Sequence, residues 1–412
     1  VITGRMQEVR WWSGSDKPVG LKGATPHITR YVPGRVGPGL TDDLDEMTDL
    51  MVKRNVAVTD FMYALWYDRR RDDHERFRRM DGEVWTPLYE LPFARSGQER
   101  AWDGLSRYDL TRFNNWYFKR LAEYARLGSE KGLVLINQHY HQHNILEAGA
   151  HYADFPWRPA NNINKTPFVE PVHYAADKRI FYDKQFYDIG DPAYAALHKG
   201  YIRHQLDNFP IGSGVIHSTS AEYTGPFHFV KFWLETVREW ETEDGHNALV
   251  ALSATKDVQD AVLADPELKK AVDVIDIRYW SEGENGFNAP PGGVHLAPRQ
   301  HVRIGSGGKS GRVTAGSVYR AVRRYREENP GKAVIYNSTG APQYGWAVFM
   351  AGGSLAAIPR VEEPGFAQAA SAMSPEGASE DYYLLSEPGE AYIVYPNAEK
   401  AEINLPATKR SY

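Results

Sequence analysis

Short apolar runs alternate with longer amphipathic runs along most of this 412-residue chain. The short runs have the composition of strands, and the longer runs carry apolar residues at helical spacing. This alternation is typical of a parallel sheet whose strands are joined by helices, so it predicts an α/β fold. The predicted strands cover residues 27–31, 56–66, 133–140, 214–220, 249–253, 274–279 and 333–336, with a last pair at 346–350 and 354–358. The predicted helices cover residues 42–54, 110–127, 193–208, 227–241, 258–272 and 316–328.

The number of strand–helix units favours a barrel over an open sheet. With the last pair counted as one, eight such units within roughly 340 residues fit a (β/α)8 TIM barrel. A doubly wound sheet is the alternative, but no glycine-rich turn follows the first predicted strand. After residue 379 short β runs predict a small C-terminal antiparallel β appendage, at residues 382–385, 391–394 and 401–405. We therefore expect a barrel domain over residues 1–378 and a small β domain over residues 379–412.

Composition narrows the classes of function. The chain has 53 acidic and 48 basic residues and a formal net charge of −5, so it lacks the basic field that holds a nucleic-acid backbone. It has no cysteine, which excludes disulfides and thiol chemistry. No run of about 18 apolar residues predicts a membrane span, and Val1 to Arg10 lack the apolar core of a signal peptide. The 11 Trp, 25 Tyr and 16 Phe residues are spread along the chain and indicate a folded globular protein, an enzyme or a sugar binder.

The active site of a TIM barrel lies at the carboxyl ends of its strands. Polar and aromatic residues therefore matter most just after each predicted strand. A rim of aromatic rings and bidentate polar groups suits a polyhydroxylated ligand. The expected substrate-binding residues are Trp66 and Asp68 after the second strand, His139 and His141 at the third, Tyr223 after the fourth, Arg278 and Trp280 at the sixth, Asn337 after the seventh, and Trp346.

Glu222 is the leading catalytic candidate. Strand alternation puts Ser218, Ser220 and Glu222 on one face, where the small neighbours leave room for a carboxyl group and a substrate. The alternative is a glutamate that pairs with an arginine in a loop.

A glycosidase needs a second carboxyl group on the other side of the bond that it cleaves. Asp276 is the best match, because the apolar residues on either side of it would face the helices. Asp276, Arg278 and Trp280 would then face the interior. A buried Asp276–Arg278 pair that braces the barrel is an equally open interpretation. Glu282, on the loop that follows, is a further candidate.

Two histidines raise a different possibility. His139 and His141 stand two apart at a strand end, as do the opening ligands of some zinc barrel hydrolases. Such sites need ligands from later strands, and the only other strand histidine, His217, would point opposite to Glu222. No metal and no cofactor are therefore predicted. The favoured roles for these histidines are hydrogen bonding to a sugar or a structural role, with a metal-dependent barrel hydrolase as the alternative.

A set of segments carries a family resemblance: residues 220–226, 229–234, 239–241, 252–260, 276–280, 297–301, 345–347 and 351–355. Together they resemble bacterial TIM-barrel glycoside hydrolases of the clan A type, from an uncharacterised family of polysaccharide-degrading bacteria. The resemblance covers most of residues 25–360. It implies the barrel fold, and it implies that the β appendage is the start of a small β-sandwich.

The resemblance also implies roles for particular residues. In that clan a glutamate at the end of strand four is the acid/base. This role falls on Glu222, although Ala221 stands where an asparagine is usual. The clan's nucleophile is a glutamate at the end of strand seven, where this chain has Asn337. The partner carboxylate is then Asp276 or Glu282, or the mechanism is inverting, or activity is lost.

The expected function is hydrolysis of glycosidic bonds in a plant or algal-type polysaccharide or an oligosaccharide derived from it. The expected partner is the carbohydrate, with no nucleic acid and no membrane span, and the resemblance implies a secreted or periplasmic location. A non-catalytic carbohydrate-binding barrel is one alternative, because the strand-seven glutamate is missing. A metal-dependent hydrolase built on His139 and His141 is the other. The sequence names neither the sugar nor the oligomeric state.

Overall fold

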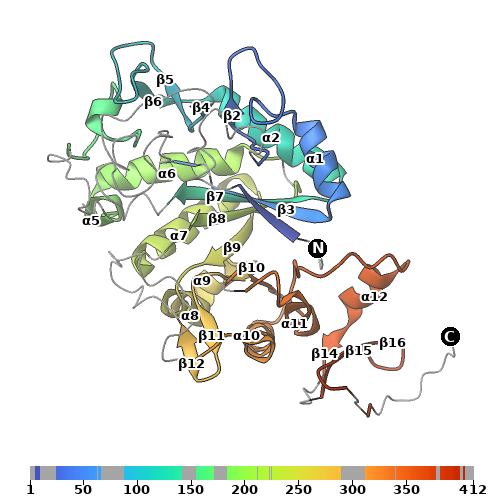
Figure 1. The fold of residues 1–412 in the computed structure, drawn as a ribbon. Coiled ribbons are helices and arrows are strands. Elements are labelled where there is room, and N and C mark those ends of the chain that lie inside the picture. The colour runs from blue at the N-terminus through green and yellow to red at the C-terminus, as the bar shows by residue number, and fades with distance from the viewer. Residues whose placement is uncertain are drawn as a thin grey trace.

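A seven-stranded parallel sheet forms the centre of the molecule (Figure 1). The computed structural model describes residues 5–9, 25–62, 64–65, 88–141, 155–170, 183–210, 212–221, 223, 225–288, 311–338, 340–376, 381–399 and 402–403. Every neighbouring pair of strands in this sheet is parallel. In sheet order the strands are β1 (Arg5–Val9), β3 (Val56–Phe61), β7 (Val134–His141), β8 (Val215–Ala221), β9 (Leu249–Ser253), β10 (Val274–Ile277) and β13 (Ala333–Tyr336).

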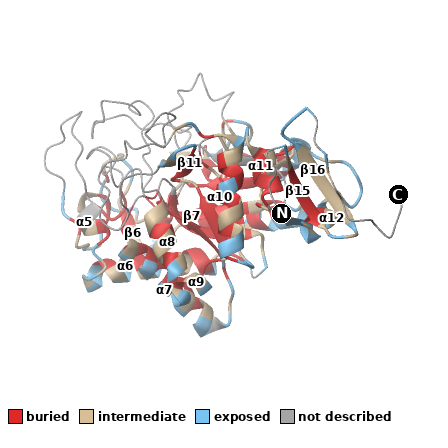
Figure 2. Ribbon diagram, turned by 90° about the horizontal axis from the view of Figure 1, so that it is seen from below, coloured by how far each residue is buried: buried red, intermediate tan, exposed pale blue. Residues whose placement is uncertain are grey.

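Helices connect the strands and cover the outer face of the sheet (Figure 1). Asp43, Asn114 and Asp191 cap three of them, each with a side-chain oxygen that accepts one or two backbone N–H groups of the first turn. In Figure 2 the strands of the central sheet, such as β7, are red, and the helices carry blue on the sides turned away from the sheet. The helices are α1 (Leu44–Lys53), α2 (Asn115–Glu130), α5 (Asp183–Phe186), α6 (Pro192–Asp207), α7 (Phe227–Asp244), α8 (Lys256–Ala264), α9 (Pro266–Lys270), α10 (Ala315–Glu328), α11 (Gly345–Met350) and α12 (Phe366–Ala372), with a 3-10 turn η3 (Pro159–Asn161).

Both faces of the sheet are buried, and successive residues alternate between them. Leu135, Val250 and Ile275 belong to the large apolar cluster between the sheet and the helices. A second, smaller cluster fills the inner face. Its buried members come one from each of six strands: Val58, Ile136, Ile216, Ala251, Val274 and Ile335.

The sheet curls strongly. Strands β3 and β10 are four steps apart in the sheet, which at about 4.8 Å per step would separate them by ~19 Å if it were flat. Arg278 Nη1, just past β10, nevertheless lies 2.5 Å from Asp60 Oδ2 on β3. The two strands must therefore face each other across the interior. This confirms the parallel α/β sheet of the predicted barrel, whereas closure of the barrel stays a prediction. Among the described residues strand pairing ends at β1 on one side and at β13 on the other.

The first and last predicted strands are wrong. The first strand of the sheet is β1, and residues 27–31 contribute only the short β2 (Arg30–Tyr31), which pairs antiparallel with β4 (Leu88–Tyr89). Residues 346–350 form helix α11 instead of a strand. Residues 354–358 are irregular because Leu355 takes a positive φ of 52°, although Ser354 N still donates to Val334 O at 2.7 Å and Leu355 packs into the inner cluster.

Two predicted helices have different bounds. Helix α2 begins at Asn115, because Tyr108–Phe113 forms strand β6 and pairs with β5 (Phe93–Arg95). The predicted helix 258–272 is divided into α8 and α9 at Asp265 and Pro266. Proline removes a backbone N–H and keeps the preceding residue extended, and Asp265 then caps α9.

The C-terminal part contains the expected antiparallel β structure. Strands β14 (Ser374–Pro375), β15 (Tyr382–Glu387) and β16 (Ala391–Pro396) form one sheet. It packs on α10 and α11, where Tyr383 stacks on Tyr319 with ring centroids 4.1 Å apart. Most of the third predicted run, 401–405, lies outside the described residues. The division into two domains stays a prediction.

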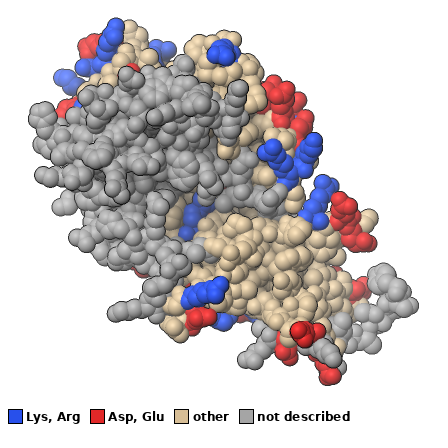
Figure 3. Space-filling model, viewed as in Figure 1, with Lys and Arg blue, Asp and Glu red and all other residues tan. Residues whose placement is uncertain are grey.

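No described helix has both the length and the apolar character needed to cross a bilayer. On the face drawn in Figure 3, basic and acidic side chains of the described residues are interspersed around its rim. The absence of a nucleic-acid partner stays a prediction.

Candidate functional site

Polar side chains replace apolar ones on the inner face near the carboxyl ends of the strands. Asp60 lies on β3, Gln138 on β7 and Asp276 on β10, and Arg278 and Asn337 follow β10 and β13 directly. Each of the three strand residues stands two positions after a member of the inner apolar cluster, so strand alternation turns it toward the same inner face. This places Asp276 and Arg278 inside, as expected from the sequence.

Arg278 lies between two aspartates. Its Nε donates to Asp276 Oδ2 at 2.8 Å, and its Nη1 donates to Asp60 Oδ2 at 2.5 Å. The second oxygen of each carboxylate accepts an amide: Asn337 Nδ2 donates to Asp276 Oδ1 at 2.8 Å, and Gln138 Nε2 donates to Asp60 Oδ1 at 2.7 Å. These five side chains, from four strands, form one connected group that we call the interior network.

Burial and charge oppose each other in the interior network. Burial raises the pKa of Asp276, the Arg278 guanidinium lowers it, and the Asp60 carboxylate raises it again, with a net upward shift. Burial by itself would lower the pKa of Arg278, but the Asp276 and Asp60 carboxylates raise it well above its ordinary value. Arg278 is therefore a fixed positive charge between two carboxylates. The buried Asp276–Arg278 pair that the sequence left as an open interpretation is present, and Asp60 is a second partner of Arg278.

The sequence reading missed Asp60 and Gln138. The predicted second strand runs to residue 66 and places its site residues beyond that point, whereas β3 ends at Phe61. An acidic residue two positions after Val58 on a buried strand was the available signal. Trp66, Asp68 and Glu222 lie outside the described residues.

His139 faces the helices and not the interior. Its Nε2 hydrogen-bonds to His217 Nδ1 at 3.0 Å, and Trp233 Nε1 on α7 donates to its Nδ1 at 3.2 Å. Burial lowers the pKa of His139 well below its ordinary value. The expected sugar contact of His139 is therefore wrong, because Ile136 and Gln138 occupy the inner face of β7. With both ring nitrogens engaged, His139 is not available to a metal either.

His141 is the last residue of β7. Among the described residues, no group of three potential His, Cys, Asp or Glu ligands gathers as a metal site would require.

Trp280 and Glu282 also point away from the interior. Strand β10 ends at Ile277, so the alternation that predicted an inward Trp280 does not continue. Trp280 is fully buried, with its ring centroid 5.3 Å from that of Tyr325 on α10. Glu282 lies in the hairpin of β11 (Ser281–Gly283) and β12 (Gly286–Asn288). It pairs with two arginines of α10, Arg320 at 3.4 Å and Arg324 at 3.1 Å.

Two further aromatic residues do not line an open site. Tyr223 is buried, and its hydroxyl donates to Pro226 O at 3.1 Å at the start of α7. Burial raises the pKa of Tyr223 well above its ordinary value. Trp346 of α11 stacks on Tyr395 of β16, with ring centroids 5.6 Å apart, and so joins this helix to the C-terminal sheet.

Three buried polar atoms beside the interior network have unused hydrogen-bonding capacity. Within the described part of the chain, Gln138 Oε1, Ser218 Oγ and Ser253 Oγ have no partner. The strand register places Ser218 beside Gln138 and Ser253 beside Asp276. A buried polar atom without a partner costs free energy, which water or a ligand can offset. The inner face is thus equipped to bond to something more than its own side chains.

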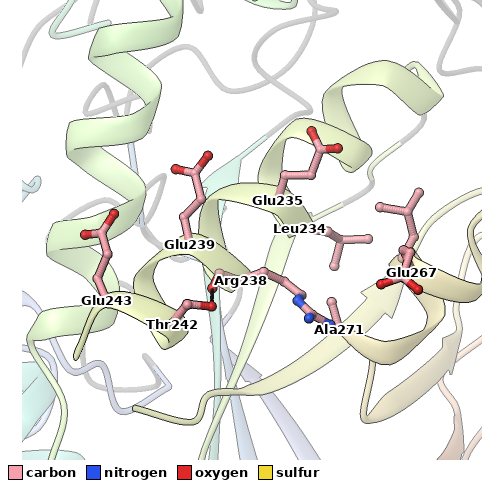
Figure 4. A pocket seen from close by; sticks show the side chains of 9 residues that line it. Leu234, Glu235, Arg238, Glu239, Thr242, Glu243, Glu267 and Ala271 are labelled. Carbon is pink, nitrogen blue, oxygen red and sulfur yellow. Dashed lines mark hydrogen bonds between the residues drawn. The ribbon is translucent and has the colours of Figure 1, made fainter. Parts of the chain in front are cut away.

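A groove of about 540 Å³ lies elsewhere, on the outer surface between α7 and α9 (Figure 4). Arg238 extends into it from α7 toward Ala271. Two of its acidic residues, Glu239 and Glu243, already pair with Lys199 and Arg203 of α6. It lies toward the amino ends of β9 and β10, away from the carboxyl ends where the interior network lies, and is not the candidate active site.

Comparison with known families identifies the family to which the chain belongs. Its sequence matches the domain of unknown function DUF6298 over residues 1–373. The chain belongs to this family. The search of curated proteins gives no match to it.

Solved structures that the protein resembles include glycoside hydrolases, in line with the resemblance in the sequence. The endo-β-1,4-mannanase from Thermotoga petrophila is 10% identical, with a TM-score of 0.41 over 88% of this chain and 69% of that one. The β-glycosidase from Thermosphaera aggregans is 12% identical, with a TM-score of 0.38 over 86% of each chain. The β-glucosidase from Trichoderma harzianum is 10% identical, with a TM-score of 0.35 over 87% of this chain and 86% of that one. Because these scores are low, we infer function from the residues of the site.

Proposed function

We propose that the protein is a glycoside hydrolase acting on a plant or algal-type polysaccharide or an oligosaccharide derived from it. The main support is the interior network, which gathers two carboxylates, a guanidinium and two amides near the carboxyl ends of a curled parallel sheet. Carboxylates in such a position supply the acid and base of glycosidic hydrolysis, and amides and guanidinium bind sugar hydroxyls. A closed (β/α)8 barrel and a secreted or periplasmic location are part of this proposal.

Glu222 is the proposed general acid, which protonates the leaving glycosidic oxygen. In the sequence it directly follows Ala221, the last residue of β8, and its spacing from Ser218 and Ser220 is that of residues on one strand face. Its position in the resembling family's motif is the second support.

Asp276 is the proposed partner carboxylate. Arg278 and Asn337 each occupy one lone pair on its two oxygens, and a carboxylate has about four, so acceptor positions remain. Substrate would approach from the side of Asn337, which is half-buried, whereas Asp276 is 1% exposed. Asp276 then either attacks the anomeric carbon or activates the water that does. Glu282 is not assigned a role here, because its carboxylate pairs with Arg320 and Arg324 on α10 and is not part of the interior network.

The proposal is tested by incubating the protein with mannan, xylan, mixed-linkage β-glucan and laminarin and measuring new reducing ends. On whichever substrate is cleaved, Glu222→Gln should lower turnover by about 100- to 10,000-fold, the usual effect of losing a general acid. Glu130→Gln is the matched control, since Glu130 is an exposed carboxylate that pairs, within the described residues, with Arg126 alone, and the variant should be as active as wild type. A Glu222→Gln variant with more than about a tenth of wild-type turnover would disprove the role of Glu222.

A non-catalytic carbohydrate-binding barrel is the competing function. It predicts saturable binding to one of these polysaccharides with no new reducing ends over several days.

A further inference from the structure

Arg278 keeps hydrogen-bond donors that its two aspartates do not use. A guanidinium has five N–H donors. Within the described chain, Nε donates to Asp276 and Nη1 to Asp60, and Nη2 has no partner. The Arg278 side chain is 9% exposed, whereas the Asp60 and Asp276 side chains are 0% and 1% exposed. The guanidinium, more than either carboxylate, is therefore the group that an incoming molecule meets.

The charge around Arg278 is negative in sum. Among the described inner-face residues the ionisable groups are Asp60, Asp276 and Arg278, so one positive charge stands against two negative ones. An anion bonded to Nη2 would lie close to both carboxylates, and like charges at such distances repel strongly in a buried site. A neutral hydroxyl bonded to Nη2 meets no such repulsion.

The unpaired atoms beside the network favour the same kind of ligand. Gln138 Oε1 can only accept a hydrogen bond, whereas the Ser218 and Ser253 hydroxyls can donate and accept. A sugar hydroxyl also donates and accepts, so it can bond to any one of these three atoms. A carboxylate or sulfate only accepts and would leave Gln138 Oε1 without a partner.

We propose that the interior site binds a neutral sugar ring through Arg278 and discriminates against uronic-acid and sulfated sugars, with Asp60 as the residue that sets this preference. The inference rests on the proposed function for the ligand being a carbohydrate, but it does not require cleavage. Asp60 acts through Arg278 and is a positioning residue, because it fixes the guanidinium and supplies the second negative charge.

Binding by isothermal titration, in the Glu222→Gln background to prevent turnover, tests the proposal. The probes are cello-, manno-, xylo- and laminarihexaose as neutral sugars and hexagalacturonate as the charged sugar. We expect at least one neutral hexasaccharide to bind about tenfold more tightly than hexagalacturonate, since one uncompensated buried charge is worth at least that factor. Tighter binding of hexagalacturonate than of every neutral probe would overturn the proposal.

Two substitutions separate the role of Arg278 in binding the sugar from the role of Asp60 in setting the preference for neutral sugars. Asp60→Asn removes one negative charge and should shift the affinity ratio about tenfold toward hexagalacturonate. Arg278→Lys keeps the charge but loses the bidentate geometry, so it should weaken neutral binding about tenfold and leave the ratio unchanged. Arg126→Met, at an exposed pair on α2, should change neither quantity.

An unchanged ratio in a folded Asp60→Asn variant would overturn the role of Asp60. If that variant fails to fold, the ratio in Arg278→Lys decides, because a shift toward the charged probe there contradicts the proposal. Cleavage of sugars by the wild type without preference for neutral ones would overturn this inference and leave the proposed function standing. No binding of any probe together with no cleavage would overturn both.

Discussion

At the scale of single residues, buried histidines show how hydrogen bonds fix a protonation state. His198 Nε2 lies 2.8 Å from Phe186 O, which can only accept, so Nε2 carries the proton. The Tyr140 hydroxyl, 2.9 Å from Nδ1, must then donate to it. Burial lowers the pKa of His198 to about 3, and that of His217 likewise to about 3, so both rings are neutral at physiological pH.

These shifts predict acid-dependent destabilisation. The unfolded chain takes up protons near pH 6.5, whereas folded His198 does not until about pH 3, so stability falls as pH drops through this window. Each such histidine contributes a slope of about 1.4 kcal/mol per pH unit. Urea unfolding at pH 7, 6 and 5 should show a smaller slope in His198→Phe than in the wild type. Tyr140→Phe loses the same hydrogen bond but keeps the imidazole, and should keep the slope; equal slopes in all three proteins would contradict the assignment.

At the scale of elements, two glycines with opposite surroundings test helix packing. Gly345 starts α11 where a Cβ would lie 2.1 Å from Ala357 O, a backbone atom that cannot move aside easily. Gly200 lies within α6, and a Cβ there would meet nothing within 4 Å. The first glycine is required by a close approach of two segments, whereas the second only weakens its helix.

Alanine at these two positions should change stability in opposite directions. Gly345→Ala should destabilise by about 3 kcal/mol through overpacking. Gly200→Ala should stabilise by about 0.5–1 kcal/mol through helix propensity. Thermal and urea unfolding of both variants measures the difference, and a Gly345→Ala protein as stable as wild type would show that α11 can shift away from residue 357.

At the scale of the whole molecule, the interior network ties together strands on opposite sides of the curled sheet. Asp60→Ala leaves buried Arg278 with one of its two carboxylates and should cost about 3–5 kcal/mol of unfolding free energy. Glu130→Ala breaks an exposed pair of similar length and should cost about 0–1 kcal/mol. Urea unfolding of both variants makes the comparison, and equal losses would mean that the cross-sheet pair adds nothing to closure of the sheet.

Much of the secondary structure was predictable because its causes are local. Strands β9 and β13 match their predictions residue for residue, since apolar runs between turn signals mark them without reference to the rest of the chain. The inward direction of Asp276 followed from alternation within one short strand. The sequence could not show which parity of β7 faces inward, and so it left His139 either a sugar contact or a structural role. For the same reason it could not show that the chain leaves the strand before Trp280.

By itself, the sequence determined the alternating βα order, the antiparallel appendage and the inward position of Asp276 with Arg278. Only the tertiary structure decided that Arg278 also meets Asp60, which is 218 positions away in the chain. Strand alternation and helical periodicity depend on residues a few positions apart, so both patterns are visible in the sequence alone. The meeting of β3 with β10 depends on how far the whole sheet curls, which is the summed result of twist and packing over every strand. Nearby sequence therefore identifies individual residues of the site, whereas the tertiary structure determines which of them meet.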